Sequence, residues 1–222
     1  MKTKNPQTIA VVGGTGAEGG GLAIRWAEAG HRVIVGSRDA ERAVEAGRSL
    51  SSHLSGERIE GMDSLSAAMS ATVVVMTVPY AAQLDTARAL GPALKDKILI
   101  DVTVPLVPPK VATVQLPAGG SSVVLVQNEL GDAVMVASAF QNVSAHKLKK
   151  LDAAIPCDVL VCANAHEVRQ RVIELAQDAG LRGIDAGPLA NSAAAEAMTS
   201  ILIWINRTYK IPDAGFAITG LE

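Results

Sequence analysis

The sequence predicts an α/β fold with a doubly wound parallel sheet. Six short apolar runs and five segments of helical periodicity are interleaved along the chain, which is the pattern of repeated βαβ units. Only 3% of the residues are aromatic, so aliphatic side chains must fill the core, as they do between buried parallel strands and helices. The 222 residues suffice for one domain with a smaller unit attached.

The individual elements are expected from these runs. The strands are predicted at residues 8–13, 32–37, 71–78, 97–102, 133–139 and 157–163. The helices are predicted at 20–30, 39–54, 81–94, 166–180 and 189–207. Gly30 and Gly180 are placed to end two of these helices, and Asp39 is placed to cap the N-terminus of another.

A glycine-rich loop follows the first strand. The segment from Gly14 to Gly19 fits G-x-G-x-x-G between an apolar strand and a helix, which is the context of a Rossmann dinucleotide site. Gly14 permits a tight turn, Gly16 lets the backbone approach a pyrophosphate, and Gly19 allows close packing of helix and strand. We therefore expect contacts to the dinucleotide from the residues of this loop, which are Gly14, Thr15, Gly16, Ala17, Glu18 and Gly19.

The end of the second strand selects the dinucleotide. A site for NAD usually places an acidic residue there, but this strand ends in Gly36, Ser37 and Arg38. Ser37, Arg38 and Arg42 favour the 2′-phosphate of NADP, because hydroxyl and guanidinium groups bind phosphate well. Asp39 could instead bond the ribose of NAD, but its position before a helix makes a capping role the better interpretation.

Two further strand ends are expected at the same edge of the sheet. Ligands in such folds gather outside the carboxyl ends of the strands, so Thr77, Val78 and Pro79 after one strand, and Ala139 and Phe140 after another, are candidate cofactor contacts. Ordinary packing at strand ends is the alternative. The proline-rich stretch 102–120 is expected to be an ordered, extended loop over this edge.

The chain after residue 145 repeats a shorter strand-helix-strand-helix pattern. We expect a dinucleotide-binding domain at 1–145 and a small C-terminal α/β extension at 146–222, which could also continue the first domain. The last helix is apolar nearly all round at 198–205, so we expect it to form a homodimer interface and to shape a second-substrate pocket. A core helix within one subunit is the alternative.

Composition excludes several classes of function. A net charge of −2 provides no general attraction for nucleic acid or anionic lipid, and no apolar run is long enough to span a membrane. Cys157 and Cys162 are expected to be buried thiols on opposite faces of a strand, and the four histidines are expected to be solvated. No metal site and no catalytic acid-base pair is predicted, and we expect a cytoplasmic protein.

These motifs together resemble the coenzyme F420-dependent NADP oxidoreductase family. The resemblance rests on the glycine loop from Gly13, on Gly36-Ser37-Arg38, on Thr77-Val78-Pro79-Tyr80, and on Asp185-Ala186-Gly187-Pro188-Leu189-Ala190-Asn191 followed by Glu196. It covers nearly the whole chain and implies hydride transfer between NADP(H) and the deazaflavin of F420. The chain departs from the archaeal-type pattern in its DVTVPLVPPK loop and in Gln141-Asn142.

Site residues carry over from this resemblance. It implies a pyrophosphate loop at Thr15 to Gly19, a 2′-phosphate site at Ser37, Arg38 and Arg42, and a nicotinamide wall at Val78 and Pro79. The implied pocket for the second substrate involves residues 140–143 and the last helix, and its candidate residues are Gln141, Asn142, Asn191, Ser192, Glu196 and Thr199. Two other functions remain open: an NADPH-dependent reductase of an imine, carbonyl or flavin, and a non-enzymatic NADP(H) sensor.

Overall fold

The computed structural model describes residues 2–56 and 58–221 and contains one eight-stranded sheet, in the order β3-β2-β1-β4-β5-β6-β7-β8. The six strands from β3 to β6 in this order are parallel, β7 is antiparallel to β6, and β8 is parallel to β7. The strands are β1 (Thr8–Val12), β2 (Arg32–Ser37), β3 (Glu60–Asp63), β4 (Val73–Met76), β5 (Ile98–Asp101), β6 (Met135–Ser138), β7 (Asp158–Ala163) and β8 (Arg182–Asp185).

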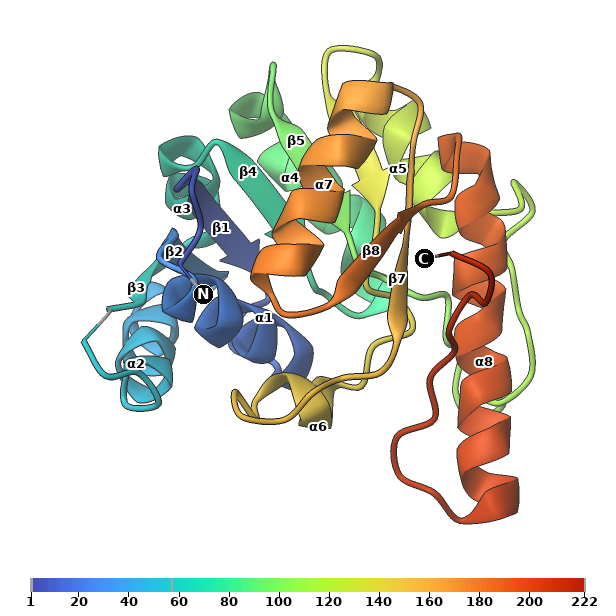
Figure 1. The fold of residues 1–222 in the computed structure, drawn as a ribbon. Coiled ribbons are helices and arrows are strands. Elements are labelled where there is room, and N and C mark those ends of the chain that lie inside the picture. Colours follow the sequence, from blue (N-terminus) through green and yellow to red (C-terminus); the bar gives the residue numbers. More distant parts are fainter. Residues whose placement is uncertain (1, 57, 222) are drawn as a thin grey trace.

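Helices cover both faces of this sheet (Figure 1). The helices are α1 (Ala17–Glu28), α2 (Ala40–Ser51), α3 (Ser64–Ser70), α4 (Gln83–Leu94), α5 (Ser122–Leu130), α6 (Ala145–Leu148), α7 (His166–Asp178) and α8 (Ser192–Tyr209). Alternate residues of the strands enter two separate cores. One core packs against α1 and α7, and the other packs against α3, α4 and α5. The predicted doubly wound α/β fold is therefore confirmed.

Short elements account for the differences from the expected pattern. The sequence pattern predicts no bounds for five elements, each of which has between four and nine residues. They are β3, α3, α5, α6 and β8. The predicted cap is present, since Asp39 accepts a hydrogen bond from the backbone N–H of Arg42. Gly30 and Gly180 have positive φ just after α1 and α7, as expected for residues that end helices.

The proline-rich loop leaves the carboxyl end of β5. No helix or strand lies between β5 and α5, in the fully described stretch 102–121. The loop is attached to the neighbouring strand end, because Thr103 Oγ1 donates a hydrogen bond to Val78 O at 3.3 Å. Its first residues therefore lie at the edge where ligands are expected.

The C-terminal elements extend the same sheet. β7 and β8 follow the expected boundary at residue 145 and add two strands beside β6. α8 stands at this end of the sheet, next to β7, and projects beyond the rest of the molecule (Figure 1). Within residues 2–56 and 58–221, no helix is long and apolar enough to cross a membrane.

One prediction about the histidines is wrong. His31 is buried: its Nδ1 accepts from the backbone N–H of Gln7 at 3.1 Å, and its Nε2 lies 2.9 Å from Asp178 Oδ2. Burial lowers the pKa of His31, and a neutral ring with its proton on Nε2 satisfies both partners. The position of His31 between a helix and a strand suggests a solvated ring, and the sequence does not reveal the burying partner, since Asp178 lies 147 positions away. The other three histidines are exposed, as predicted.

Candidate functional site

The glycine loop is tightly packed on one side and open on the other. A Cβ on Gly19 would lie 2.4 Å from Thr77 Oγ1 and 2.9 Å from Gly14 Cα, so only glycine lets α1 approach the end of β4 this closely. At Gly16, among the described residues other than its two neighbours in the chain, the only heavy atom within 4 Å of such a Cβ is Gly13 O, at 3.2 Å. The space in front of Gly16 is therefore free for a ligand that approaches the backbone.

The N-terminus of α1 faces the same space. α1 begins at Ala17, and its cap residue Gly16 has no side chain to accept the first free N–H groups. These donors and the helix dipole favour an anion such as a pyrophosphate. Thr15 and Glu18 are both half-buried here. Desolvation raises the pKa of the Glu18 carboxyl, which weakens the repulsion between this group and a bound phosphate.

Two unpaired guanidinium groups lie beyond β2. Arg38 and Arg42 are exposed, and within the described part of the chain neither guanidinium has an ion-pair partner. Asp39 is committed to the cap of α2, since its Oδ1 accepts from Arg42 N at 3.1 Å. Ser37 is half-buried, and its hydroxyl oxygen accepts from Asp39 N at 3.2 Å. The cations, rather than Asp39, are thus available to a ligand.

The end of β4 lies against the glycine loop. Thr77 Oγ1 donates to Val12 O at 3.1 Å, which joins the end of β4 to the end of β1. Val78 is half-buried and Pro79 is exposed. These two residues present a mostly apolar surface at the carboxyl edge, next to the loop.

The end of β6 offers backbone rather than side chains. Ala139 and Phe140 are fully buried, and the ring of Phe140 packs edge-on against Trp26, with centroids 5.8 Å apart. Phe140 has a φ of 72°, an uncommon conformation for a bulky residue and one that is found disproportionately at functional sites. This conformation turns the chain sharply at the carboxyl edge.

The two residues after this turn are both buried. Gln141 Nε2 donates to Asp101 O at 2.8 Å, whereas Gln141 Oε1 has no hydrogen-bond partner among the residues that the structure describes. Asn142 Nδ2 donates to Asp158 O at 2.7 Å and to Cys157 Sγ at 3.0 Å. Gln141 therefore keeps an unused acceptor at the carboxyl edge, while the amide N–H groups of Asn142 hold the start of β7.

The polar residues of α8, and Asn191 just before it, differ in how far they are buried. Asn191 is exposed, Thr199 is half-buried, and Ser192 and Glu196 are buried. Thr199 Oγ1 donates to Gln141 O at 2.8 Å, which brings α8 directly onto the end of β6. The structure thus joins two of the candidate second-substrate residues and turns Glu196 inward.

A buried polar network that the sequence reasoning missed surrounds Glu196. Gln83 Nε2 bridges Asp101 Oδ2 at 2.7 Å and Ser122 Oγ at 3.3 Å. Ser121 Oγ donates to Glu196 Oε1 at 2.6 Å, and Ser122 N donates to Glu196 Oε2 at 2.8 Å. Burial raises the pKa of Asp101 to about 6. The one feature of the local sequence that could have indicated this network is Asp101, an acidic residue at the end of an apolar strand.

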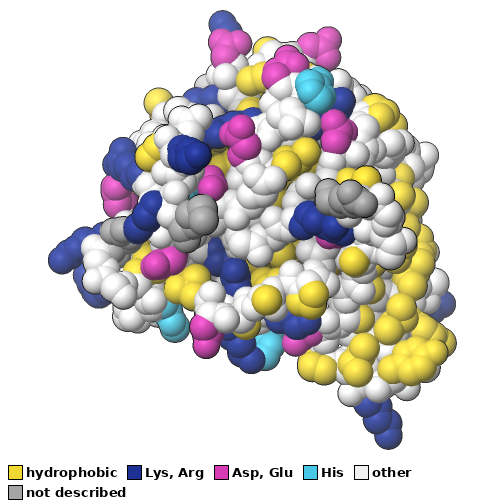
Figure 2. Space-filling model, viewed as in Figure 1, with side chains coloured by type: hydrophobic (Ala, Val, Ile, Leu, Met, Phe, Trp, Pro, Cys, Tyr) yellow, Lys and Arg dark blue, Asp and Glu magenta, His cyan; other side chains and the backbone are white. Residues whose placement is uncertain are grey.

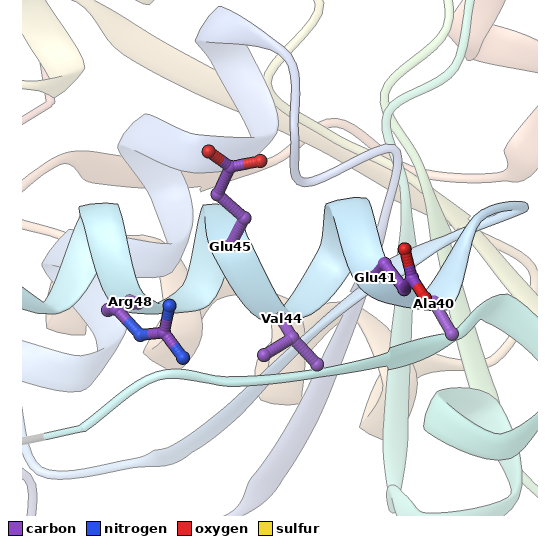
Figure 3. A pocket seen from close by; sticks show the side chains of 5 residues that line it. All are labelled: Ala40, Glu41, Val44, Glu45 and Arg48. Carbon is purple, nitrogen blue, oxygen red and sulfur yellow. The ribbon is translucent and has the colours of Figure 1, made fainter.

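Other candidate sites are less well formed. A shallow groove runs along α2, but Figure 3 shows its side chains projecting to different sides of the helix, with Glu45 pointing away from Val44. All five lining residues come from this one helix, namely Ala40, Glu41, Val44, Glu45 and Arg48. Within residues 2–56 and 58–221, no cluster of three or more His, Cys, Asp or Glu could hold a metal ion. The carboxyl edge remains the candidate site.

Comparisons with known proteins identify the family of this chain. A family model described as "NADP oxidoreductase coenzyme F420-dependent" matches residues 8–105. A protein of Methanocaldococcus jannaschii named F420-dependent NADP reductase is 40% identical over 222 residues, which cover 96% of this chain and 99% of that protein. A protein of the same name from Methanothermobacter thermautotrophicus is 38% identical over 229 residues, which cover 96% of this chain and 95% of that protein.

Solved structures resemble the fold. A protein of Arthrobacter sp. FB24 has a TM-score of 0.80 at 23% identity, with 96% of this chain and 99% of that chain covered. An imine reductase from Bacillus cereus has a TM-score of 0.63 at 12% identity, with 91% of this chain and 62% of that chain covered. The sheet and its helices are thus an arrangement known from solved structures.

Proposed function

The chain belongs to the coenzyme F420-dependent NADP oxidoreductase family, and we propose that it transfers a hydride between NADP(H) and coenzyme F420. The observation that carries this proposal is 40% identity to an F420-dependent NADP reductase along nearly the full length of both chains. Spectrophotometry with purified protein, NADPH and oxidised F420 tests it. Loss of absorbance from both oxidised F420 and NADPH supports the proposal, whereas NADPH oxidation only with an imine, carbonyl or flavin indicates another reductase. Tight binding without turnover indicates a sensor.

The residues of the glycine loop fit a dinucleotide. The open backbone at Gly16 and the free N–H groups of the first turn of α1 would hold the pyrophosphate. Ser37, Arg38 and Arg42 would hold the 2′-phosphate. Val78 and Pro79, with the backbone of Ala139 and Phe140, would border the nicotinamide. The second substrate would then lie between this edge and α8, near Gln141 and Thr199.

Positioning is the main contribution of the protein to the reaction. The nicotinamide and deazaflavin rings, when bound, supply the hydride donor and acceptor. The chain's own residues would hold the rings in contact and exclude water, which removes the entropic cost of bringing them together. Asp101 and Glu196, the buried acids near this edge, are already hydrogen-bonded within the protein. We therefore assign no general acid or base.

Replacement of Arg38 by alanine should weaken NADPH binding by about 10- to 100-fold, because a hydrogen bond to a charged group contributes roughly 1.5–3 kcal/mol. NADH affinity should stay nearly unchanged, since NADH has no 2′-phosphate. Fluorescence titration of both nucleotides measures the effect. Arg48→Ala, an exposed arginine further along α2, is the matched control. Equal affinities of the parent protein for NADH and NADPH would rule out the assignment.

We also propose that the protein is a homodimer formed through α8. Three large hydrophobic side chains of this helix are exposed: Ile201 by 43%, Trp204 by 61% and Tyr209 by 71%. Apolar side chains gather at the corner of the molecule that α8 occupies (Figure 2). An exposed apolar surface of this kind usually marks an interface.

Light scattering at micromolar concentration should give about twice the chain mass of 22.9 kDa. Ile201→Glu and Trp204→Glu should each give the mass of one chain, because they put a charge into the interface. Met69→Glu is the control, since Met69 is 67% exposed on α3. A parent protein with the mass of a single chain would exclude the dimer.

We also propose that the reaction takes place in the cytoplasm. Cys157 and Cys162 are both buried free thiols in this structure, as expected from the sequence. Chains with free cysteines and no disulfide are typical of reducing compartments.

A further inference from the structure

We infer that Glu196 is a positioning residue that sets α8, and with it the second-substrate side of the site, against the proline-rich loop. Glu196 is 1% exposed, and its carboxylate points toward the N-terminus of α5. It therefore does not touch the substrate. The inference rests on the proposed function only where it concerns F420.

Three donors converge on this carboxylate. Ser121 Oγ donates at 2.6 Å and Val123 N at 3.3 Å to Oε1, and Ser122 N donates at 2.8 Å to Oε2. The donors belong to the N-cap residue and the first turn of α5, where the helix dipole also favours negative charge. Hydrogen bonds to a charged acceptor are stronger than neutral ones, so this contact holds α8 firmly to α5.

The same network holds both ends of the proline-rich loop. The loop begins after Asp101 and ends at Ser121. Gln83 ties its two ends together, because Gln83 Nε2 contacts Asp101 Oδ2 and Ser122 Oγ. Ser192 of α8 adds a second contact at the far end of the loop, since its hydroxyl lies 2.6 Å from Ser121 Oγ. Glu196 thus fixes α8 relative to the end of the loop.

A shift of α8 would move residues at the carboxyl edge of the sheet. Thr199 lies about one turn after Glu196 on the same helix, and its hydroxyl donates to Gln141 O. Gln141 in turn donates to Asp101 O at the end of β5. Among the described residues, the glycine loop and the arginines after β2 have no part in this network, whereas Thr103 links Asp101 to Val78 O at the proposed nicotinamide wall. Loss of Glu196 should therefore affect the second substrate far more than the binding of NADPH.

The test compares Glu196→Gln with the parent protein. The amide has only one acceptor oxygen, and its NH2 group would face N–H or O–H donors, so α8 should loosen. We expect the KM for F420 to rise at least 10-fold while the Kd for NADPH changes less than 2-fold. Hydrogen exchange should accelerate in segments 121–126 and 192–203. Glu167→Gln, an exposed acid in the first turn of α7, is the control for removal of a charge.

Ser121→Ala provides a second variant in case Glu196→Gln does not fold. It removes one of the three donors to Glu196, together with the cap that Ser121 Oγ provides to Val124 N, and leaves both backbone N–H groups. Its changes should therefore have the same direction as those of Glu196→Gln. An unchanged KM for F420 in both variants, or an equal loss of NADPH affinity, would overturn the inference. If the parent protein does not turn over F420, the proposed function fails, and hydrogen exchange still tests the role of Glu196: unchanged exchange in both segments refutes it.

Discussion

Replacement of Gly16 by valine should weaken NADPH binding by at least 100-fold while the protein stays folded. The backbone at Gly16 is extended, with a φ of −80° and a ψ of 171°, a conformation that valine adopts readily. Gly13 O lies 3.2 Å from the new Cβ, and a small shift accommodates this contact. The side chain would instead fill the space that a pyrophosphate needs, and a 100-fold loss corresponds to about 2.7 kcal/mol.

Fluorescence titration and thermal unfolding together separate binding from folding. Gly56→Val should change neither, because no atom of the described residues beyond its chain neighbours lies within 4 Å of a Cβ at Gly56. Gly19→Ala should lower both the unfolding temperature and the affinity, since its Cβ would meet Thr77 and Gly14. If Gly16→Val bound NADPH as tightly as the parent protein, the glycine loop would not be the pyrophosphate site.

The strands that could be predicted are those buried on both faces. β1, β4 and β7 are continuous apolar runs because helices cover both of their faces, and the sequence reveals them directly. β3 and β8 are the two ends of the sheet, and their sequences EGMD and RGID contain no apolar run. α5 was missed because its segment VVLV has no helical periodicity.

The candidate site also has a part that the sequence could predict and a part that it could not. The glycine loop and the cap at Asp39 are local patterns, so the residues and their neighbours in the sequence were enough to predict them. Glu196 is different, because its partners at Ser121 and Ser122 lie more than 70 positions away. Ser192, Glu196 and Thr199 were expected near the second substrate, and their spacing of four and three residues puts them on one flank of α8. That spacing does not show whether the flank faces a pocket or another helix.

Arg25 is a second residue whose partners lie far away in the sequence, and its replacement has the largest expected effect on stability. This arginine is 6% exposed in the last turns of α1. Its strongest hydrogen bonds are to three backbone carbonyls: Leu148 O at 2.8 Å, Ala179 O at 2.9 Å and Lys150 O at 2.7 Å. Two longer contacts reach Lys147 O and Ala153 O. One guanidinium therefore satisfies carbonyls at the ends of α6 and α7 and joins both helices to α1.

Arg25→Met should lower the free energy of unfolding by about 3–5 kcal/mol, because it leaves several buried carbonyls without a donor. For a chain of this size, the midpoint of thermal unfolding should fall by roughly 6–20 °C. Arg32→Met is the matched control: Arg32 is exposed and pairs with Glu60 at the surface, so its loss should change the midpoint far less. The glycine loop lies at the opposite end of α1 from Arg25. At a temperature where Arg25→Met is folded, its affinity for NADPH should therefore stay within a few-fold of that of the parent protein. If Arg25→Met instead had the same unfolding midpoint as Arg32→Met, Arg25 would not hold α1, α6 and α7 together.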